Sequence, residues 1–207
     1  MFDRFLSRLR AFLGEPLAKS LRRRLRAAAP SPISELREGL HCRIAGTVRV
    51  LDNTTQTASL SGLTCVAYLL EILETHAGGE HLLVYDKRAV PFVLADGGHH
   101  ALIDPSHCQL LVGRPHTLDR TTGFLSDPRQ RAILQRYWPG GTYPYTTRMR
   151  YREGVVEPGT RVALAGVGAR EVDPHAQSER GYRDEARQRL RFVGSEELPL
   201  LVGDDPP

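Results

Sequence analysis

The sequence predicts a mainly β protein: a small OB-like barrel or a β-sandwich with one inserted helix, preceded by an N-terminal amphipathic helical arm. Short apolar or alternating runs recur at fairly regular spacing, with Gly, Pro and Asp turn signals between them, which is typical of barrels and sandwiches. The longest apolar run, Cys65 to Leu70, is too short to span a membrane and belongs in a folded core. Positive charge is concentrated in the first 29 residues.

Length and composition fit one domain of ordinary size with appendages. The chain has 207 residues, of which 41% are hydrophobic, and this is enough for a core. Its three cysteines form no Cys-x-x-Cys pair, which disfavours a disulfide framework or a zinc ribbon and indicates a reducing, cytoplasmic setting. We therefore interpret Cys42, Cys65 and Cys108 as small buried core residues.

Residues 1–29 form a basic arm. They carry eight Lys/Arg against Asp3 and Glu15, a net charge of +6, which leaves the other 178 residues at −2. Such asymmetry predicts contact with something anionic. Helical spacing predicts an apolar face, with arginines elsewhere on the helix. That face comprises Phe2, Phe5, Leu6, Leu9, Phe12 and Leu13, and the arginines are Arg4, Arg8 and Arg10.

A second helical segment follows the break at Gly14 to Pro16. Leu17, Leu21 and Leu25 recur at i, i+4 and i+8, surrounded by Arg22, Arg23, Arg24 and Arg26. Three interpretations stay open for the arm. It is a membrane-surface helix, which we favour, a helix packed on its own domain or on a partner protein, or a targeting peptide. A linker over 30–39 then leads into the body.

The body, residues 40–202, reads as a series of strands. Period-2 alternation predicts a strand from Cys42 to Val50. Residues 63–76 fit either a strand or a helix, and Thr64, Cys65 and Tyr68 favour the strand. Further strands are expected at His81–Asp86, Val90–Ala95, His99–Ile103, Cys108–Val112, Thr147–Val156, Arg161–Val167, Leu190–Val193 and Leu198–Val202, with a charged loop over Asp173–Gln188 and a free tail over 203–207.

Residues 113–148 interrupt this rhythm and are predicted to be an insertion over one barrel end. Asp127 and Pro128 signal the start of a helix that runs to about Tyr137. An aromatic cluster follows, which we interpret either as a partner-binding surface or as the insertion's own small core. It comprises Tyr137, Trp138, Tyr143 and Tyr145.

The order of several signals resembles the GIDE or "beside a membrane" (BAM) domain. These signals are Gly46, Ser61-Gly62 with Cys65 and Tyr68, the stretches Phe92–Gly98 and Ala101–Pro105, Tyr151–Gly154, Pro158–Val162 and Gly166. This family includes a membrane-anchored RING-type ubiquitin ligase of mitochondria and many bacterial proteins. The resemblance covers roughly residues 40–172, and we expect it to extend through residue 202.

The resemblance implies a β-rich module that binds or senses beside a membrane and does not catalyse. This chain departs from the family in having no apolar stretch long enough to span a bilayer, and no Cys/His-rich RING after Val202. Ubiquitin-ligase activity is therefore not carried over. We expect the arm at 1–29 to replace the anchor, and the protein to lie at the inner face of a membrane.

Motifs for catalysis are weak. A metal site would need His99 or His100 with His107 and Asp104, but neighbouring strand residues point to opposite faces. The expected function is thus a non-enzymatic, membrane-peripheral binding or scaffold module without a cofactor or metal, whose arm meets an anionic membrane or a partner protein. An OB-like nucleic-acid-binding protein is the alternative, disfavoured by the body's charge of −2. A metal-dependent hydrolase is the second alternative.

Overall fold

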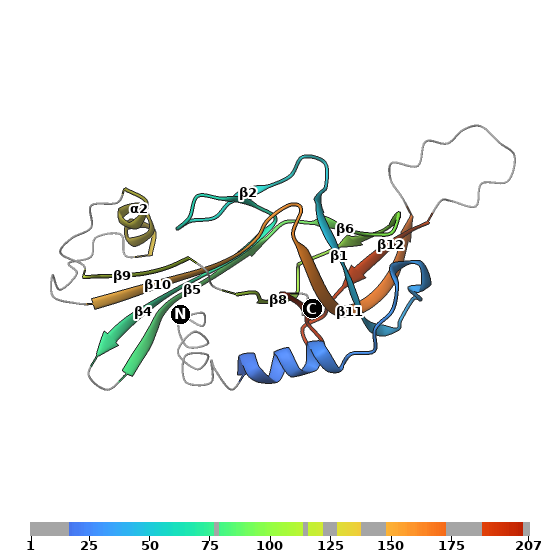
Figure 1. Cartoon of the computed structure of the whole chain (residues 1–207), viewed down its shortest axis with the longest axis horizontal. Helices are drawn as coiled ribbons and strands as arrows, with labels where there is room; N and C mark the ends of the chain where they lie inside the picture. Colours follow the sequence, from blue (N-terminus) through green and yellow to red (C-terminus); the bar gives the residue numbers. More distant parts are fainter. Residues whose placement is uncertain are drawn as a thin grey trace, which may run out of the picture. The chain divides into compact units, whose positions relative to one another are not determined.

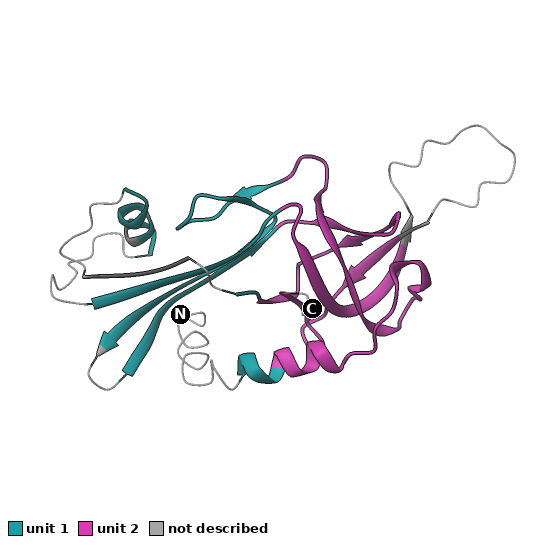
Figure 2. Ribbon diagram, viewed as in Figure 1, with its two compact units in different colours: residues 1–20, 55–89, 112–157 teal, residues 21–54, 90–111, 158–207 magenta. Residues whose placement is uncertain are grey.

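The computed structural model describes residues 17–76, 79–113, 116–121, 128–137, 148–172 and 188–204. The chain divides into two compact units built from alternating segments (Figure 2). Residues 1–20, 55–89 and 112–157 form one, which we call the sheet unit. Residues 21–54, 90–111 and 158–207 form the other, which we call the barrel unit. The stretch 40–202, predicted as one domain, thus contributes to both units.

The barrel unit contains a closed five-stranded mixed barrel (Figure 1). Around the ring the order is β1-β6-β7-β12-β11 and back to β1, and the pair β7–β12 is parallel. Numbered along the chain this is 1-2-3-5-4, the order of the Greek-key OB-fold barrel, so the predicted fold class is confirmed. The strands are β1 (His41–Val50), β6 (Phe92–Asp96), β7 (His99–Ile103), β11 (Arg161–Val172) and β12 (Gln188–Val193).

Alternation explains how β1 lines the barrel. Cys42, Ile44 and Val48 are almost fully buried, whereas the residues between them are partly accessible. Gly46 lies in this inward row, and a Cβ atom there would come within 2.6 Å of the Ala95 carbonyl oxygen. The glycine therefore allows the close approach that a mid-strand glycine predicts.

Two further strands extend the barrel. β13 (Leu200–Asp204) pairs with β11 on one side and with β8 (Cys108–Leu111) on the other. Gly203 pairs with both Ala163 and Leu111. The prediction of a free tail from residue 203 was wrong at its start, because this ladder continues through Gly203 and Asp204.

Residues 28–40 do more than link the arm to the body. Ile33, in the short helix η1 (Ile33–Glu35), is 2% exposed, and Leu36 is 4% exposed. Pro30 and Glu38 form isolated bridges with Arg43 and Gly168. The predicted linker is therefore fastened to the barrel unit by apolar burial and by backbone pairing.

The sheet unit is built on four antiparallel strands in the order β5-β4-β10-β9. A ribbon of β2 and β3 accompanies them, with a helix, α2. Residues 63–76 are extended, as predicted, and the pairing of β4 with both neighbours explains why strand propensity prevails. The bounds are β2 (Gln56–Thr57), β3 (Thr64–Cys65), β4 (Ala67–His76), β5 (Gly79–Ala89), β9 (His116–Thr121), α2 (Pro128–Tyr137) and β10 (Arg148–Val156).

The helix α2 occupies the predicted residues. Its Ile133 is 4% exposed and packs in the core cluster of the sheet unit with Tyr68, Leu70 and Tyr151. The helix therefore belongs to the sheet unit, and the expectation that the insertion lies over a barrel end stays a prediction. The sequence interpretation missed β9 and β2, which are short and carry little apolar periodicity.

Candidate functional site

The second half of the arm is a helix over residues 17–27, which from Leu21 onward belongs to the barrel unit and packs within it. Leu21 and Leu25, one turn apart, are 9% and 5% exposed. They form a cluster with Leu111, Ala165 and Leu201, and Ala28 joins it just beyond the helix. Burying two leucines contributes about 1.5–3 kcal/mol each. The barrel unit thus covers Leu21 and Leu25 of the predicted stripe, whereas Leu17 is 41% exposed.

Backbone and side-chain hydrogen bonds fasten the end of this helix. The Arg43 N–H donates to the Ala29 carbonyl and the Ser31 N–H to the Arg43 carbonyl, both at 2.8 Å. The guanidinium of Arg43 reaches the carbonyl of Arg26 at 3.4 Å, and that of Arg22 reaches the carbonyl of Leu111 at 3.4 Å. The helix is therefore held at its exit as well as along its buried stripe.

The arginines of this helix are exposed. Arg22, Arg23, Arg24 and Arg26 all lie at the surface. A helix turns about 100° per residue, so Arg23 lies roughly opposite the buried leucines and Arg26 beside it, while Arg22 and Arg24 flank the stripe. Residues 17–27 include no acidic residue. The docked helix thus presents a basic face away from the barrel.

The first part of the arm lies outside the described residues. This applies to the predicted membrane-binding residues Phe2, Arg4, Phe5, Leu6, Arg8, Leu9, Arg10, Phe12 and Leu13. Their proposed role stays a prediction.

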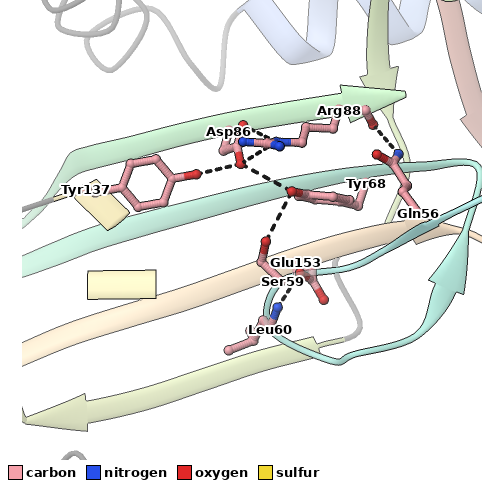
Figure 3. A network of polar contacts seen from close by, with 8 residues as sticks. All are labelled: Gln56, Ser59, Leu60, Tyr68, Asp86, Arg88, Tyr137 and Glu153. Carbon is pink, nitrogen blue, oxygen red and sulfur yellow. Dashed lines mark hydrogen bonds and ion pairs between the residues drawn. The ribbon is translucent and has the colours of Figure 1, made fainter. Parts of the chain in front are cut away.

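In the sheet unit, a polar network converges on the carboxylate of Asp86 in β5 (Figure 3). The hydroxyl of Tyr137, at the end of α2, donates to it at 2.5 Å, and that of Tyr68 in β4 donates at 3.3 Å. The Nε of Arg88 completes the set at 3.2 Å. Ser59 in turn donates to the Tyr68 oxygen at 3.1 Å. This network joins α2, β4 and β5.

A second polar contact involves Glu153 of β10, which is fully buried. Its two carboxylate oxygens accept the N–H groups of Leu60 and Ser61 at 2.7 and 2.8 Å (Figure 3 draws the Leu60 contact). Arg129 of α2 donates to the carbonyl of Ser61 at 2.6 Å. The turn between β2 and β3 is therefore held by two groups, the carboxylate of Glu153 from β10 and the guanidinium of Arg129 from α2.

Sequence reasoning missed Glu153, although a signal for it exists. Met149 and Tyr151 precede it at two-residue spacing on the buried face of β10. Strand periodicity places the next residue of that row, Glu153, inward as well. An acidic residue at an inward position of a strand predicts a buried partner.

Burial keeps the phenols and the thiol of the sheet unit protonated. Burial raises the pKa of Tyr68 and that of Tyr137, and the hydrogen bond from Tyr137 to Asp86 adds to the latter effect. Burial also raises the pKa of the Cys65 thiol to about 11, helped by the charges of Glu153 and Glu157. These hydroxyls therefore act as donors at neutral pH, and Cys65 is a thiol and not a nucleophilic thiolate.

The predicted aromatic surface is only partly described. Tyr137 is half-buried, and its hydroxyl is used by Asp86. Trp138, Tyr143 and Tyr145 lie outside the described residues. Tyr137 thus helps to hold α2 to β5 through its hydrogen bond to Asp86. The partner-binding role of the aromatic cluster stays a prediction.

The histidines around β7 do not assemble a metal centre in the described part of the chain, where no group of three metal-ligating side chains is found. Asp104 accepts the Ser106 N–H at 2.9 Å and forms an ion pair with Arg191. Although burial raises the pKa of Asp104, these hydrogen bonds outweigh it and bring the pKa below its usual value. Asp104 therefore bonds to residues of the barrel unit itself, Ser106 and Arg191.

The outer surface of the OB-like barrel carries few groups suited to stacking bases. By alternation, the outward positions along β1, β6 and β7 include Arg43, Thr47, Arg49, Val93, His100 and Leu102. The unit's two phenylalanines in β6 and β12 are 1% and 0% exposed. Single-stranded nucleic acid usually binds through aromatic stacking within a basic groove, and the outward positions of these three strands hold no Phe, Tyr or Trp.

Comparison with known proteins gives no relative for this chain. No family model, no curated protein and no solved structure matches it. Among the described residues, no helix combines the length and the apolar character needed to cross a bilayer.

Proposed function

We propose that this protein is a non-enzymatic binding or scaffold module that works beside an anionic membrane, to which its N-terminal arm holds it. The observation that carries the proposal is the helix over residues 17–27. Its Leu21 and Leu25 are buried on the barrel unit, and its four arginines, Arg22, Arg23, Arg24 and Arg26, are exposed. A surface that binds these arginines therefore also positions the barrel unit.

Charge and amphipathicity both support a membrane as the anionic surface. The arm carries the whole positive excess of the chain, since the remaining residues sum to −2. Its first half combines a Phe/Leu face with arginines, which is the composition of interfacial helices. The resemblance of the body to the GIDE domain also leads us to expect a module that works beside a membrane.

The polar network of the sheet unit supports a structural role for its carboxylates. Asp86 is shared by two tyrosines and an arginine, and Glu153 by two backbone N–H groups. Groups engaged in this way hold elements together. These two carboxylates therefore support the interpretation of the sheet unit as a framework for binding.

Co-sedimentation of the full chain with vesicles tests the proposal. We expect it to pellet with anionic vesicles, and Phe5→Glu with Leu9→Glu to abolish pelleting, because two charges enter the lipid-facing side of the arm. The matched control is Leu40→Glu with Gln135→Glu, which changes the net charge equally at two exposed positions outside the arm. If the wild-type chain stays in the supernatant, the proposal is wrong.

The strand order of the barrel favours one alternative, binding of single-stranded nucleic acid, because OB-folds serve this function widely. The alternative predicts binding to single-stranded oligonucleotides that weakens steeply as salt increases. The near-neutral body and the absence of Phe, Tyr or Trp at the outward positions of β1, β6 and β7 weigh against it. Tight, salt-dependent oligonucleotide binding combined with absent vesicle binding would favour it over our proposal.

A further inference from the structure

The two parts of the arm differ in which of their faces are available to bind a partner. In residues 17–27 the leucines Leu21 and Leu25 are buried against Leu111, Ala165 and Leu201, whereas Leu17 at the start of the helix is 41% exposed. From Leu21 onward, the surface that the helix leaves for an outside partner is therefore mainly its basic face. The helical spacing of Phe and Leu in residues 2–13 predicts a second apolar stripe in the arm.

A glycine of the barrel unit makes space for a side chain of this docked helix. Gly203 of β13 faces Leu25, and a Cβ atom at Gly203 would lie 2.6 Å from the Leu25 Cδ2 atom. The absent side chain therefore makes room for the leucine. Together with the bonds between Arg43 and residues 26–31, this fixes the direction in which the arginines point relative to the barrel.

We infer that residues 17–27 form a fixed phosphate-binding surface, in which Arg23, Arg24 and Arg26 bind headgroup phosphates of an anionic bilayer while residues 2–13 provide the apolar anchor. This inference rests on the proposed function and assigns its lipid selectivity to three residues. Guanidinium groups pair well with phosphate oxygens. Arg23 and Arg26 are one turn apart, so they can meet neighbouring headgroups.

The occupant is a lipid surface because of what precedes the helix. An amphipathic segment that suits the interface ends a few residues before Leu17. A basic helix that follows such a segment in the sequence is suited to the headgroup level, where basic residues gain most from anionic lipid. The docked helix would then hold the barrel unit at a defined orientation to the bilayer.

Lipid selectivity of the full chain tests this inference. The variant is Arg23→Gln, Arg24→Gln and Arg26→Gln, which keeps good helix formers in place. Each basic residue near an anionic surface changes partitioning about fivefold, so we expect about a 100-fold loss of binding to phosphatidylserine-containing vesicles. Binding to neutral vesicles should be unchanged, whereas Phe5→Glu with Leu9→Glu should reduce both.

The matched control removes three other exposed arginines. Arg37→Gln, Arg49→Gln and Arg131→Gln give the same net charge from surface positions elsewhere. We expect this control to retain most of the anionic binding. Equal losses in the two triple variants would overturn the inference, because they would show a general charge effect and not a surface on this helix.

Two further outcomes separate the inference from the proposed function. If the wild-type chain binds anionic vesicles and the helix variant binds them equally well, the inference fails and the proposed function stands. If the wild-type chain does not bind vesicles, both fail. Loss of oligonucleotide binding in the helix variant, with vesicle binding intact, would overturn the lipid assignment in favour of nucleic acid.

Hydrogen exchange checks that the surface is fixed. Amides of residues 21–27 should exchange slowly in the free protein, and Gly203→Leu should accelerate them by at least tenfold because it displaces Leu25. Fast exchange of these amides in the wild-type chain would overturn the inference, because the arginines would then have no set orientation.

Discussion

In the barrel unit the fully buried large side chains are apolar, such as Ile44, Phe92 and Leu94, whereas the sheet unit buries Glu153 and Gln130. Closure of the barrel pairs each of its five strands on both sides, so an apolar interior suffices. The four-stranded sheet is open, and α2 and the β2–β3 ribbon must be fastened to it. The polar groups hold these elements to the sheet. Removing a buried polar group should therefore destabilise the sheet unit most, whereas adding a bulky side chain to the interior should destabilise the barrel unit most.

The largest effect should follow Glu153→Ala. The change leaves the N–H groups of Leu60 and Ser61 without their acceptor, and we expect the free energy of unfolding to fall by about 3 kcal/mol. Denaturant unfolding measures the loss, and hydrogen exchange should place it in β4 and β10. Glu80→Ala is the control, since Glu80 pairs with Arg150 and Arg152 at a partly exposed site and should cost at most about 1 kcal/mol. Equal losses would contradict the fastening role of Glu153.

The corresponding steric test in the barrel unit is Gly46→Val. The new side chain would meet the Ala95 carbonyl and Leu94, and we expect a loss of about 2 kcal/mol from overpacking. Exchange should increase in β1 and β6 and not in the sheet unit. Ala45→Val, at the neighbouring half-buried position, should change stability by less than about 0.5 kcal/mol. A loss confined to the sheet unit would show that the two units do not respond separately.

The sequence predicted single elements better than their partners. The alternation from Cys42 to Val50 identified β1, and Pro128 marked the start of α2, because both signals are local. The register of β4 with β10 joins residues about 80 positions apart, and no local pattern encodes such pairing. For the same reason the division into two units and the buried position of Glu153 were not predicted. The docking of residues 17–27 was one of the interpretations left open. The cluster around Leu21 and Leu25, with the space at Gly203 on β13, distinguishes it from a helix whose leucines face lipid.

A smaller effect should appear at alkaline pH and again distinguish the units. Burial raises the pKa of Tyr151, in the sheet unit, to about 12, against about 10 in an unfolded chain. The folded state then holds the proton more tightly, so this stability is complete below pH 10 and is lost as pH rises toward 12. At pH 11 the loss from Tyr151 amounts to about 1.4 kcal/mol. Tyr151→Phe should flatten the decline in stability above pH 10, and an unchanged slope in this variant would contradict the assignment.

The smallest expected effect concerns the link between α2 and the sheet. Tyr137→Phe removes one of three donors to Asp86 and should lower the free energy of unfolding by about 1 kcal/mol. Because Tyr68 and Arg88 still satisfy the carboxylate, the loss should appear mainly as faster exchange in α2. A double-mutant cycle with Tyr68→Phe measures the coupling, since the two phenols share one acceptor oxygen. We expect the double variant to lose more than the sum of the single losses, because Asp86 is then left with Arg88 alone. Strict additivity would mean that each tyrosine bonds independently, and that the network fastens α2 less cooperatively than its geometry indicates.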